Sequence, residues 1–281
     1  MRKVFRALLA SAFAVVFSVS AMAQQHKIAV AAHRGFWNCE EAGYAQNSIK
    51  ALALAQENGF WGSEFDVQLT SDDVPIVNHD NSYGGVKIWD NPFSAFKDMT
   101  LKNGERIPTL DEYLTQGEKS KSTILVFELK EQKDEAREDK LVELSLKALK
   151  EHNLYNPSRV IFISFSIHMC REIAKLAPEF TNQYLGSDIS PDELAKDGIN
   201  GVDYHYSNFY SKPWYEQARN HSMSINAWTV DGKEDIQKMI DLGVDCITTN
   251  VPLTVREMLG KNEDIIPAKG LKAKKIKSKR K

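Results

Sequence analysis

The sequence contains little cysteine. Its three cysteines, Cys39, Cys170 and Cys246, are spread over 281 residues. A set this small and scattered excludes the disulfide framework that stabilises many small exported domains. An apolar core must therefore stabilise the fold, and the chain is long enough for one large core.

Long apolar runs are also scarce. The one prominent run, Ala7–Val19, follows three basic residues and precedes the small-residue stretch Ala21-Met22-Ala23. The run is short for a membrane span, and this layout is typical of a secretory signal peptide over residues 1–23. No cysteine directly follows the predicted cleavage site, which argues against a lipid anchor. We expect an exported protein, periplasmic or secreted, with an uncleaved anchor as the alternative.

Between its two ends the chain is poor in basic residues. The leader holds three of the 36 Lys and Arg residues and Lys269–Lys281 holds eight, which leaves 25 against 38 Asp and Glu. A body this acidic lacks the basic surface that neutralises nucleic acid phosphates, so we expect no nucleic acid partner. The basic tail, residues 261–281, is too polar to fold and is expected to be disordered. It is either a solvated tail or makes weak contact with an anionic membrane surface.

Short β-rich runs alternate with helical patterns over the 258 residues that follow the predicted leader. The expected strands are Ile28–Ala32, Gly62–Val67, Thr123–Leu129, Arg159–Phe165, Asn182–Leu185, Gly201–Tyr204, Ser224–Val230 and Asp245–Thr249. The expected helices are Ser48–Asn58, Lys140–Lys150, His168–Leu176, Lys233–Leu242 and Leu253–Leu259. Eight strands that alternate with helices predict an α/β fold, a single (β/α)₈ TIM barrel over residues 26–260.

One short connection departs from this alternation. Only four residues separate Leu69 from Val74, whereas parallel neighbours need a crossover of a dozen or more. Pro75–Asn78 must therefore return antiparallel, as a β-hairpin extension after the second strand, and His79 falls opposite Glu64 to Asp66. The stretch Asn81–Arg106, rich in Gly, Asn, Asp and aromatic residues, is expected to be a short loop insertion over one face.

Acidic and basic side chains stand at the ends of the first three barrel strands. Glu64 and Asp66 are two residues apart and share one face of their strand. The first strand ends in Ala-His33-Arg34-Gly and the third in Phe-Glu128-Leu-Lys130. Barrel enzymes hold their sites at the carboxyl ends of the strands, so we expect all these groups to meet there. The alternative is a solvated hairpin with polar decoration.

This set of side chains indicates chemistry on a phosphate ester. Three carboxylates without a nearby cysteine form a hard oxygen site, suited to Ca²⁺ or Mg²⁺ rather than zinc. Arg34 and Lys130 offer positive charge to phosphate oxygens. Two histidines, His33 and His79, can exchange protons near neutral pH, one as base and one as acid.

The motifs together resemble the glycerophosphodiester phosphodiesterase family. They are AHRG, QNS, SEFDV, VNHD, RIPTLDEYL, FELK, AWTV and CITTNVP, in that family's order over Lys27 to Leu259. The resemblance implies a TIM barrel that hydrolyses a small-molecule glycerophosphodiester to sn-glycerol 3-phosphate and an alcohol with a divalent cation. It places the catalytic pair on His33 and His79. It places the metal ligands on Glu64, Asp66 and Glu128, and the phosphate contacts on Arg34 and Lys130.

The sequence departs from the family pattern at two positions. The family usually has Glu where this chain has Gln46, and Asp where it has Asn250. Since neither is a metal ligand or catalytic histidine, we expect altered supporting hydrogen bonds or substrate preference. Four aromatic residues are candidates to line the pocket for the leaving alcohol: Trp37, Trp89, Phe165 and the substrate-binding candidate Trp228. For Phe165 and Trp228 the alternative is ordinary packing of the barrel.

Three other functions compete with this interpretation. A related phospholipase D-like barrel enzyme would use the same histidines and metal to form a cyclic phosphate from lysophospholipids. A glycosidase would need two carboxylates but neither His33 nor a metal. A catalytically silent phosphodiester-binding protein would keep the barrel without turnover. The sequence leaves the preferred head group and the oligomeric state open.

Overall fold

The computed structural model describes residues 27–263. The predicted signal peptide and most of the predicted basic tail lie outside the described residues. None of the helices between Lys27 and Glu263 is long and apolar enough to cross a membrane.

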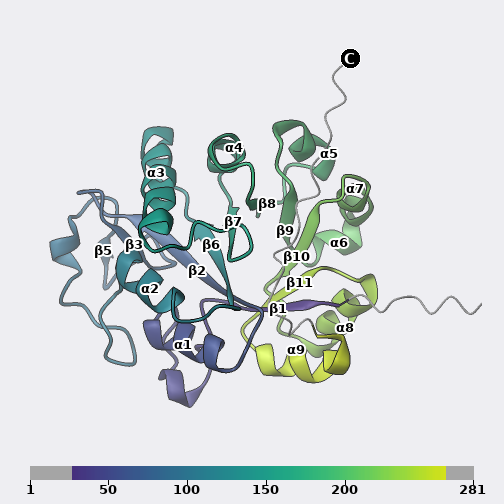
Figure 1. The fold of residues 1–281 in the computed structure, drawn as a ribbon, viewed down its shortest axis with the longest axis horizontal. Coiled ribbons are helices and arrows are strands. Elements are labelled where there is room, and N and C mark those ends of the chain that lie inside the picture. The colour runs from purple at the N-terminus through teal and green to yellow at the C-terminus, as the bar shows by residue number, and fades with distance from the viewer. Residues whose placement is uncertain (1–26, 264–281) are drawn as a thin grey trace, which may run out of the picture.

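Eight parallel strands form a closed barrel, because β1 is hydrogen-bonded to both β2 and β11 (Figure 1). The strands are β1 (Ala29–Ala32), β2 (Gly62–Leu69), β6 (Ile124–Leu129), β7 (Val160–Ser164), β8 (Thr181–Tyr184), β9 (Gly201–His205), β10 (Ser224–Trp228) and β11 (Cys246–Thr249). The prediction of a TIM barrel is confirmed.

Helices surround the barrel (Figure 1). They are α1 (Ile49–Glu57), α2 (Leu110–Gly117), α3 (Glu135–Glu151), α4 (Ile167–Leu176), α5 (Pro191–Leu194), α6 (Asn208–Ser211), α7 (Trp214–Asn220), α8 (Lys233–Leu242) and α9 (Pro252–Leu259). Single turns of 3₁₀ helix lie at Glu40–Ala42, Phe93–Ala95, Ala195–Asp197 and Gly260–Asn262. Several helices begin at side-chain caps: Asp134, for example, accepts a hydrogen bond from Arg137 N and starts α3 five residues before the predicted Lys140.

Alternation along the strands separates two apolar layers. Odd-numbered residues of β2 and β6 pack outward against the helices, where the Phe65 ring lies 4.5 Å from that of Tyr113 and 4.6 Å from that of Phe127. Even-numbered residues point into the barrel, where Ile124 and Val126 belong to the interior apolar cluster. The next inward position on β6 is Glu128, so the interior changes from apolar to charged toward the carboxyl ends of the strands.

The predicted hairpin extension is present. Strand β3 (Pro75–Val77) pairs antiparallel with β2, with Val77 opposite Val67. Beyond β3, the amide N–H of Asn78 still donates to the carbonyl of Asp66 (3.0 Å). The hairpin therefore delivers His79 to the same end of β2 that carries the carboxylates.

The predicted loop insertion has more structure than a loop. It contains the two-stranded sheet β4 (Ser82–Tyr83) and β5 (Val86–Lys87), and it lies on the left of the barrel in Figure 1. An apolar cluster of its own, built on Ile88, Phe96 and Leu101, packs it against Ile76 of β3. The insertion is thereby fixed beside the mouth of the barrel.

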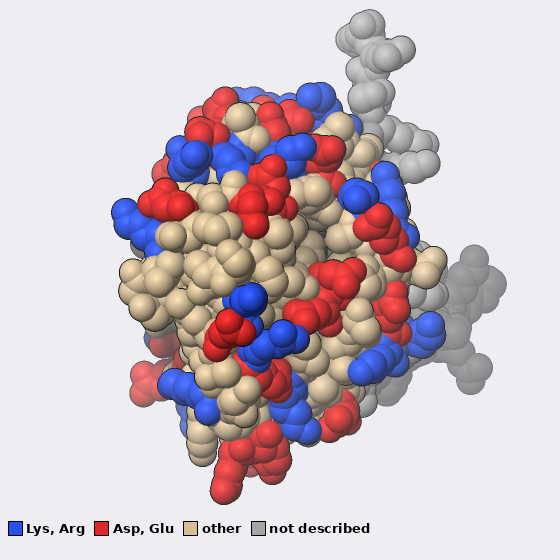
Figure 2. Space-filling view, turned by 90° about the vertical axis from the view of Figure 1, so that its left-hand side faces the viewer, with Lys and Arg blue, Asp and Glu red and all other residues tan. Residues whose placement is uncertain are grey.

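Acidic and basic side chains are interspersed on the face of the molecule that Figure 2 shows, and much of its centre is uncharged. This face carries no continuous basic stripe of the kind that follows a nucleic acid backbone.

Candidate active site

Three buried carboxylates form the centre of the site. Glu64 and Asp66 point inward from β2, and the register places Glu128 of β6 directly beside Asp66. Their exposed fractions are 2%, 1% and 7%, and one oxygen from each lies within 4.8 Å of the others. The sequence prediction that these acids converge is therefore correct.

The carboxylate cluster could hold a metal ion. Glu64 Oε1 accepts no hydrogen bond from the described residues, and Asp66 Oδ1 and Glu128 Oε1 both lie beside one cation, Lys130 Nζ. Burial, followed by repulsion from the other carboxylates, raises the pKa of Glu64 well above its usual value and that of Glu128 to about 7. Unpaired buried carboxylates are costly, and an all-oxygen donor set suits Ca²⁺ or Mg²⁺. These residues thus fit a divalent cation.

Two cationic side chains flank the cluster. Lys130 Nζ lies 2.7 Å from Glu128 Oε1 and 3.5 Å from Asp66 Oδ1, and Arg34 Nε lies 3.8 Å from Asp66 Oδ2. Burial opposes ionisation of Asp66, but attraction to Lys130, His79 and Arg34 outweighs it and lowers the pKa of that carboxyl. Asp66 is therefore the ionised member of the cluster.

The turn after β1 depends on a glycine. Arg34 and Gly35 both have positive φ, 57° and 78°. A Cβ on Gly35 would lie 2.7 Å from the Cβ of Ala51, so only glycine fits. The turn aims the amide N–H of Arg34 at Glu64 Oε2 (2.7 Å) and fixes His33 beside the carboxylates.

His33 lies between a carboxylate and an amide. Its Nε2 is 3.9 Å from Glu64 Oε2, and its Nδ1 is 2.9 Å from Asn250 Oδ1. Burial, followed by repulsion from Arg34, lowers the pKa of His33 to about 4. The imidazole is therefore neutral at neutral pH and able to accept a proton.

His79 is held by the end of the hairpin. The buried Gln68 amide lies within 2.7–3.0 Å of three consecutive carbonyl oxygens, those of Asn78, His79 and Asp80. His79 Nδ1 contacts the Asp80 carboxylate at 2.7 Å. Burial lowers the pKa of His79, although the nearby Asp66 carboxylate opposes the shift.

Both histidines line one cavity of about 170 Å³. Arg34, Glu64 and Glu128 also line this cavity. The remaining lining residues are four apolar or aromatic ones and three polar ones: Ile163, Phe165, Leu185, Trp228, Asp203, Thr229 and Thr248. Trp228 and Phe165 pack edge to face, 5.5 Å between ring centroids. Two of the four aromatic candidates therefore line the cavity that also holds His33 and His79.

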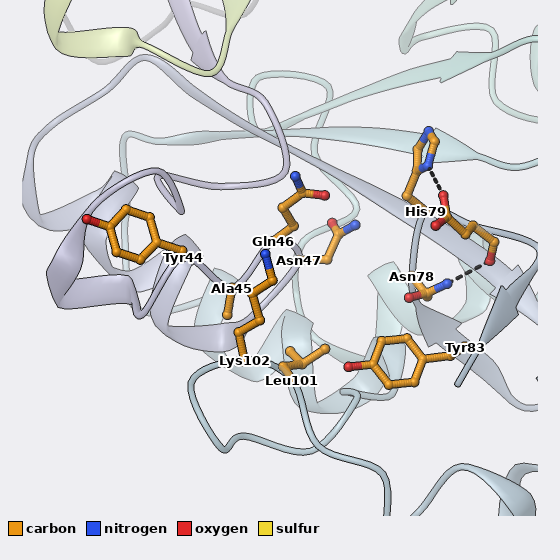
Figure 3. Close-up of a pocket in the computed structure, with 10 residues that line it drawn as sticks. Tyr44, Ala45, Gln46, Asn47, Asn78, His79, Tyr83, Leu101 and Lys102 are labelled. Atoms are coloured by element: carbon orange, nitrogen blue, oxygen red, sulfur yellow. Dashed lines mark hydrogen bonds and ion pairs between the residues drawn. The ribbon is translucent and has the colours of Figure 1, made fainter. Parts of the chain in front are cut away.

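The cavity continues into two open grooves on either side of His79. One, of about 640 Å³, is lined by Trp89, Lys130 and Phe165, with Asp80 and Glu131 as acidic neighbours. The other, of about 270 Å³, lies between the loop Tyr44–Asn47 and the segment Asn78–Tyr83 (Figure 3). Trp37 instead donates its indole N–H to Asn250 Oδ1 (3.2 Å).

Both departures from the family pattern touch site residues. Gln46 Oε1 accepts a hydrogen bond from Arg34 Nη1 (2.7 Å), and Asn250 contacts His33. Each neutral amide therefore contacts a predicted site residue: Gln46 contacts the predicted phosphate ligand Arg34, and Asn250 contacts the predicted catalytic residue His33. This position next to the site agrees with the expectation of altered supporting hydrogen bonds.

Sequence reasoning missed three supporting residues. Asn47, buried and with φ of 57°, donates to Asp66 Oδ2 (2.8 Å). Asp231 accepts from the side chain and main chain of Asn250, both at 2.8 Å. Asp203 occupies the inner wall of the cavity. The signal for Asp203 was an acid within an otherwise uncharged strand, GVDYH.

Comparison with known proteins identifies the family. The sequence model of the Glycerophosphoryl diester phosphodiesterase family matches residues 33–254. A Caldanaerobacter subterraneus subsp. tengcongensis protein named glycerophosphodiester phosphodiesterase is 32% identical over 84% of this chain and 99% of its own length.

Solved structures agree with this assignment. The crystal structure of a glycerophosphodiester phosphodiesterase from Parabacteroides distasonis has a TM-score of 0.81 and 40% identity, over 84% of this chain and 98% of that one. The fold also matches an Oleispira antarctica phosphodiesterase solved with the product sn-glycerol-3-phosphate, with a TM-score of 0.69 and 24% identity over 83% and 97% of the two chains. The chain therefore belongs to the glycerophosphoryl diester phosphodiesterase family and is a phosphoric diester hydrolase.

Proposed function

We propose that this enzyme hydrolyses glycerophosphodiesters to sn-glycerol 3-phosphate and an alcohol, with His33 and His79 as its acid–base pair. The observation that carries the proposal is that both imidazoles line one cavity together with Arg34, Glu64 and Glu128. The names of the relatives support the substrate class.

Each charged group has a distinct role in the proposed site. Arg34 and Lys130 bind the non-bridging phosphate oxygens, and the neutral wall around Trp228 packs against the carbon atoms of the substrate. Glu64, Asp66 and Glu128 hold a divalent cation, Ca²⁺ or Mg²⁺, whose charge stabilises the negative charge that develops on the phosphoryl group.

The two histidines move protons in opposite directions. His33 accepts the proton of the attacking hydroxyl as the new P–O bond forms, because its lowered pKa keeps it neutral. His79 donates a proton to the oxygen of the departing alcohol as the old P–O bond breaks, because the carboxylates of Asp66 and Asp80 favour its protonated form against the effect of burial. The attacking hydroxyl belongs to water, or to the glycerol itself, in which case water then opens the cyclic phosphate.

Hydrolysis assays test this proposal. Purified protein is given glycerophosphocholine, glycerophosphoethanolamine or glycerophosphoinositol with Ca²⁺, Mg²⁺ or EDTA, and products are followed by ³¹P NMR. We expect turnover that EDTA stops, and a loss of at least about 10²–10⁴-fold in His33→Ala and His79→Ala. His221→Ala is the matched control, because His221 pairs with the exposed Asp192 (2.8 Å).

Four results would contradict parts of the proposal. Full rates in excess EDTA would exclude the metal role of the three carboxylates. Normal turnover in His33→Ala or His79→Ala would exclude the acid–base pair. A stable cyclic phosphate from lysophospholipids would identify the related phospholipase reaction, and binding without turnover would identify a silent binding protein.

We also propose that the enzyme acts outside the cytoplasm, on the basis of the leader sequence. N-terminal sequencing of the mature protein should then begin at Gln24, after the predicted cleavage site.

A further inference from the structure

Asp203 is a buried acid that the proposed reaction does not use. It points into the barrel from β9, is 1% exposed, and neither of its carboxyl oxygens has a hydrogen-bond partner within residues 27–263. Nearly all buried polar side chains are hydrogen-bonded, and an unsatisfied one destabilises the fold. A ligand that satisfies Asp203 would remove this destabilisation.

The neighbours of Asp203 are engaged elsewhere. Asn226 and Thr248 exchange hydrogen bonds with each other at 3.0 and 3.1 Å. Trp228 donates its indole N–H to the main-chain oxygen of Asp203 (2.7 Å), not to the carboxyl group. Burial and the nearby Glu128 raise the pKa of Asp203 well above its usual value, although the Asn226 amide opposes the shift. The carboxyl oxygens of Asp203 can accept a hydrogen bond from a hydroxyl group.

The cavity around Asp203 suits a small polyol. Asp203 and Thr248 line this cavity together with the apolar side chains of Ile163 and Leu185. Arg34 and His33, where the phosphate is expected, line the same cavity and follow β1, which β10 and β11 separate from β9. A ligand that spans this cavity of about 170 Å³ needs a phosphate at one end, a short carbon chain in the middle and a hydroxyl at the other end.

We infer that Asp203 is a substrate-binding residue whose carboxyl group hydrogen-bonds a hydroxyl of the glycerol half of the substrate. The departing alcohol then occupies the wider groove of about 640 Å³ beside Trp89 and Glu131. The inference rests on the proposed function for the identity of the phosphate ester. Beyond the proposed function, it states that the glycerol half of the substrate enters the barrel and that Asp203 recognises it.

This contact makes the enzyme selective for hydroxylated esters. A site built to hydrogen-bond a substrate hydroxyl discriminates strongly against an analogue that lacks it, because the buried polar group is then left unpaired. Propyl phosphate has the carbon chain of sn-glycerol 3-phosphate without its two hydroxyl groups. The wild-type protein should therefore bind sn-glycerol 3-phosphate about 10- to 100-fold more tightly than propyl phosphate.

Calorimetric titration of both phosphates tests the inference without any turnover. In Asp203→Ala and Asp203→Leu the affinity ratio between the two phosphates should fall toward one. Gln183→Met is the matched control, since Gln183 is another buried polar residue of the interior, on β8, and the ratio should stay unchanged there. Because Asp203→Leu removes an unpaired buried carboxyl, its melting temperature should equal or exceed that of the wild type.

Failure of this inference is distinct from failure of the proposed function. A wild-type protein that binds both phosphates equally would overturn the role of Asp203, and so would either Asp203 variant that keeps the wild-type ratio. A wild-type protein that keeps the ratio but hydrolyses no glycerophosphodiester would contradict only the proposed reaction.

Discussion

His33 Nδ1 lies 2.9 Å from Asn250 Oδ1, and Asn250 in turn donates its side-chain amide to Asp231 at 2.8 Å. The contact with Asp231 fixes the amide so that its oxygen faces His33. His33 must then carry its proton on Nδ1, which leaves Nε2 free on the side of Glu64. A neutral amide therefore orients the proposed base without adding a negative charge next to it.

Asn250→Asp should change the pH dependence of the enzyme. A carboxylate beside His33 favours the protonated imidazole, so the pKa of His33 should rise from its low value of about 4 toward neutrality. The acidic limb of kcat/KM should then move to higher pH. Asn250→Asp combined with Asp231→Asn is the companion variant, because it removes the repulsion between the two carboxylates. An acidic limb that stays in place in both variants would show that Asn250 does not set the charge of His33.

Gln46→Glu should weaken phosphate binding. Gln46 holds Arg34 Nη1 at 2.7 Å without neutralising it. A glutamate there would form an ion pair with Arg34 and compete with the phosphate, so KM should rise about 10-fold, with a smaller effect on kcat. Gln56→Glu serves as control, because Gln56 lies on α1 and contacts Gln116 (2.7 Å) instead of a site residue. Equal changes in KM for the two variants would contradict this role of Gln46.

Local rules were enough to predict the carboxylate cluster. Glu64 and Asp66 share a face because side chains alternate along a strand, and four residues between Leu69 and Val74 permit only a hairpin. The contact between His33 and Asn250 joins residues 217 apart and exists only because β11 closes on β1. No local sequence pattern predicts such a contact. Nor does one predict that Asp203 lines a cavity without a hydrogen-bond partner for its carboxyl oxygens among the described residues.

Helix α2 was not predicted, although the sequence contains a local signal for its start. Thr109 and Glu112 form a capping box at its start, the pattern that marks a helix N-terminus in a sequence. Helix α7 has seven residues and no side-chain cap, so neither periodicity nor capping predicts it. The insertion was expected to be a loop because its polar and glycine residues obscure the few apolar ones that pack it.

Cation binding should strengthen as pH rises through neutrality. Folding raises the pKa of Glu128 from 4.5 to about 7, so the metal-free native state retains a proton that the unfolded chain has lost. The stability from this group is complete below pH 4.5 and is lost as pH rises through about 7. Cation binding requires the ionised form of Glu128, so a bound cation would restore the stability that is lost as pH rises.

Thermal melts with and without Ca²⁺ or Mg²⁺ measure this effect. The gain in melting temperature should be larger at about pH 8 than at about pH 6.5, and Glu128→Gln should reduce the difference. Titration of His33 does not interfere between pH 6.5 and 8. Folding lowers its pKa from 6.5 to about 4, so its contribution to the stability of the fold is lost only as pH drops below 6.5. A gain independent of pH would contradict the assignment of Glu128 as a ligand.

Gly35→Ala should be far more damaging than Gly59→Ala. Both glycines have positive φ, 78° and 64°, so each substitution carries the backbone cost of about 1–2 kcal/mol. A Cβ at Gly59 meets nothing within 4 Å, whereas one at Gly35 would lie 2.7 Å from Ala51 Cβ. Urea denaturation should therefore show about 1–3 kcal/mol of additional destabilisation for Gly35→Ala, together with reduced activity because His33 and Arg34 move. Equal losses of stability in the two variants would mean that Ala51 can move away from the added methyl group without a loss of folding free energy.

The two ends of the described chain meet beneath the barrel. The amide N–H of Ile28 donates to the carbonyl of Asn262 (3.1 Å), and Arg256 anchors Glu263 at 2.8 and 2.9 Å. Both ends lie at the amino end of β1, whereas His33 lies at its carboxyl end. Residues 27 and 263 are thus close enough to be joined by a short linker. Such a linker would allow a circularly permuted protein whose new ends lie at the exposed residues Lys121 and Ser122. Residues 27 and 263 therefore both lie at the end of the barrel that faces away from His33.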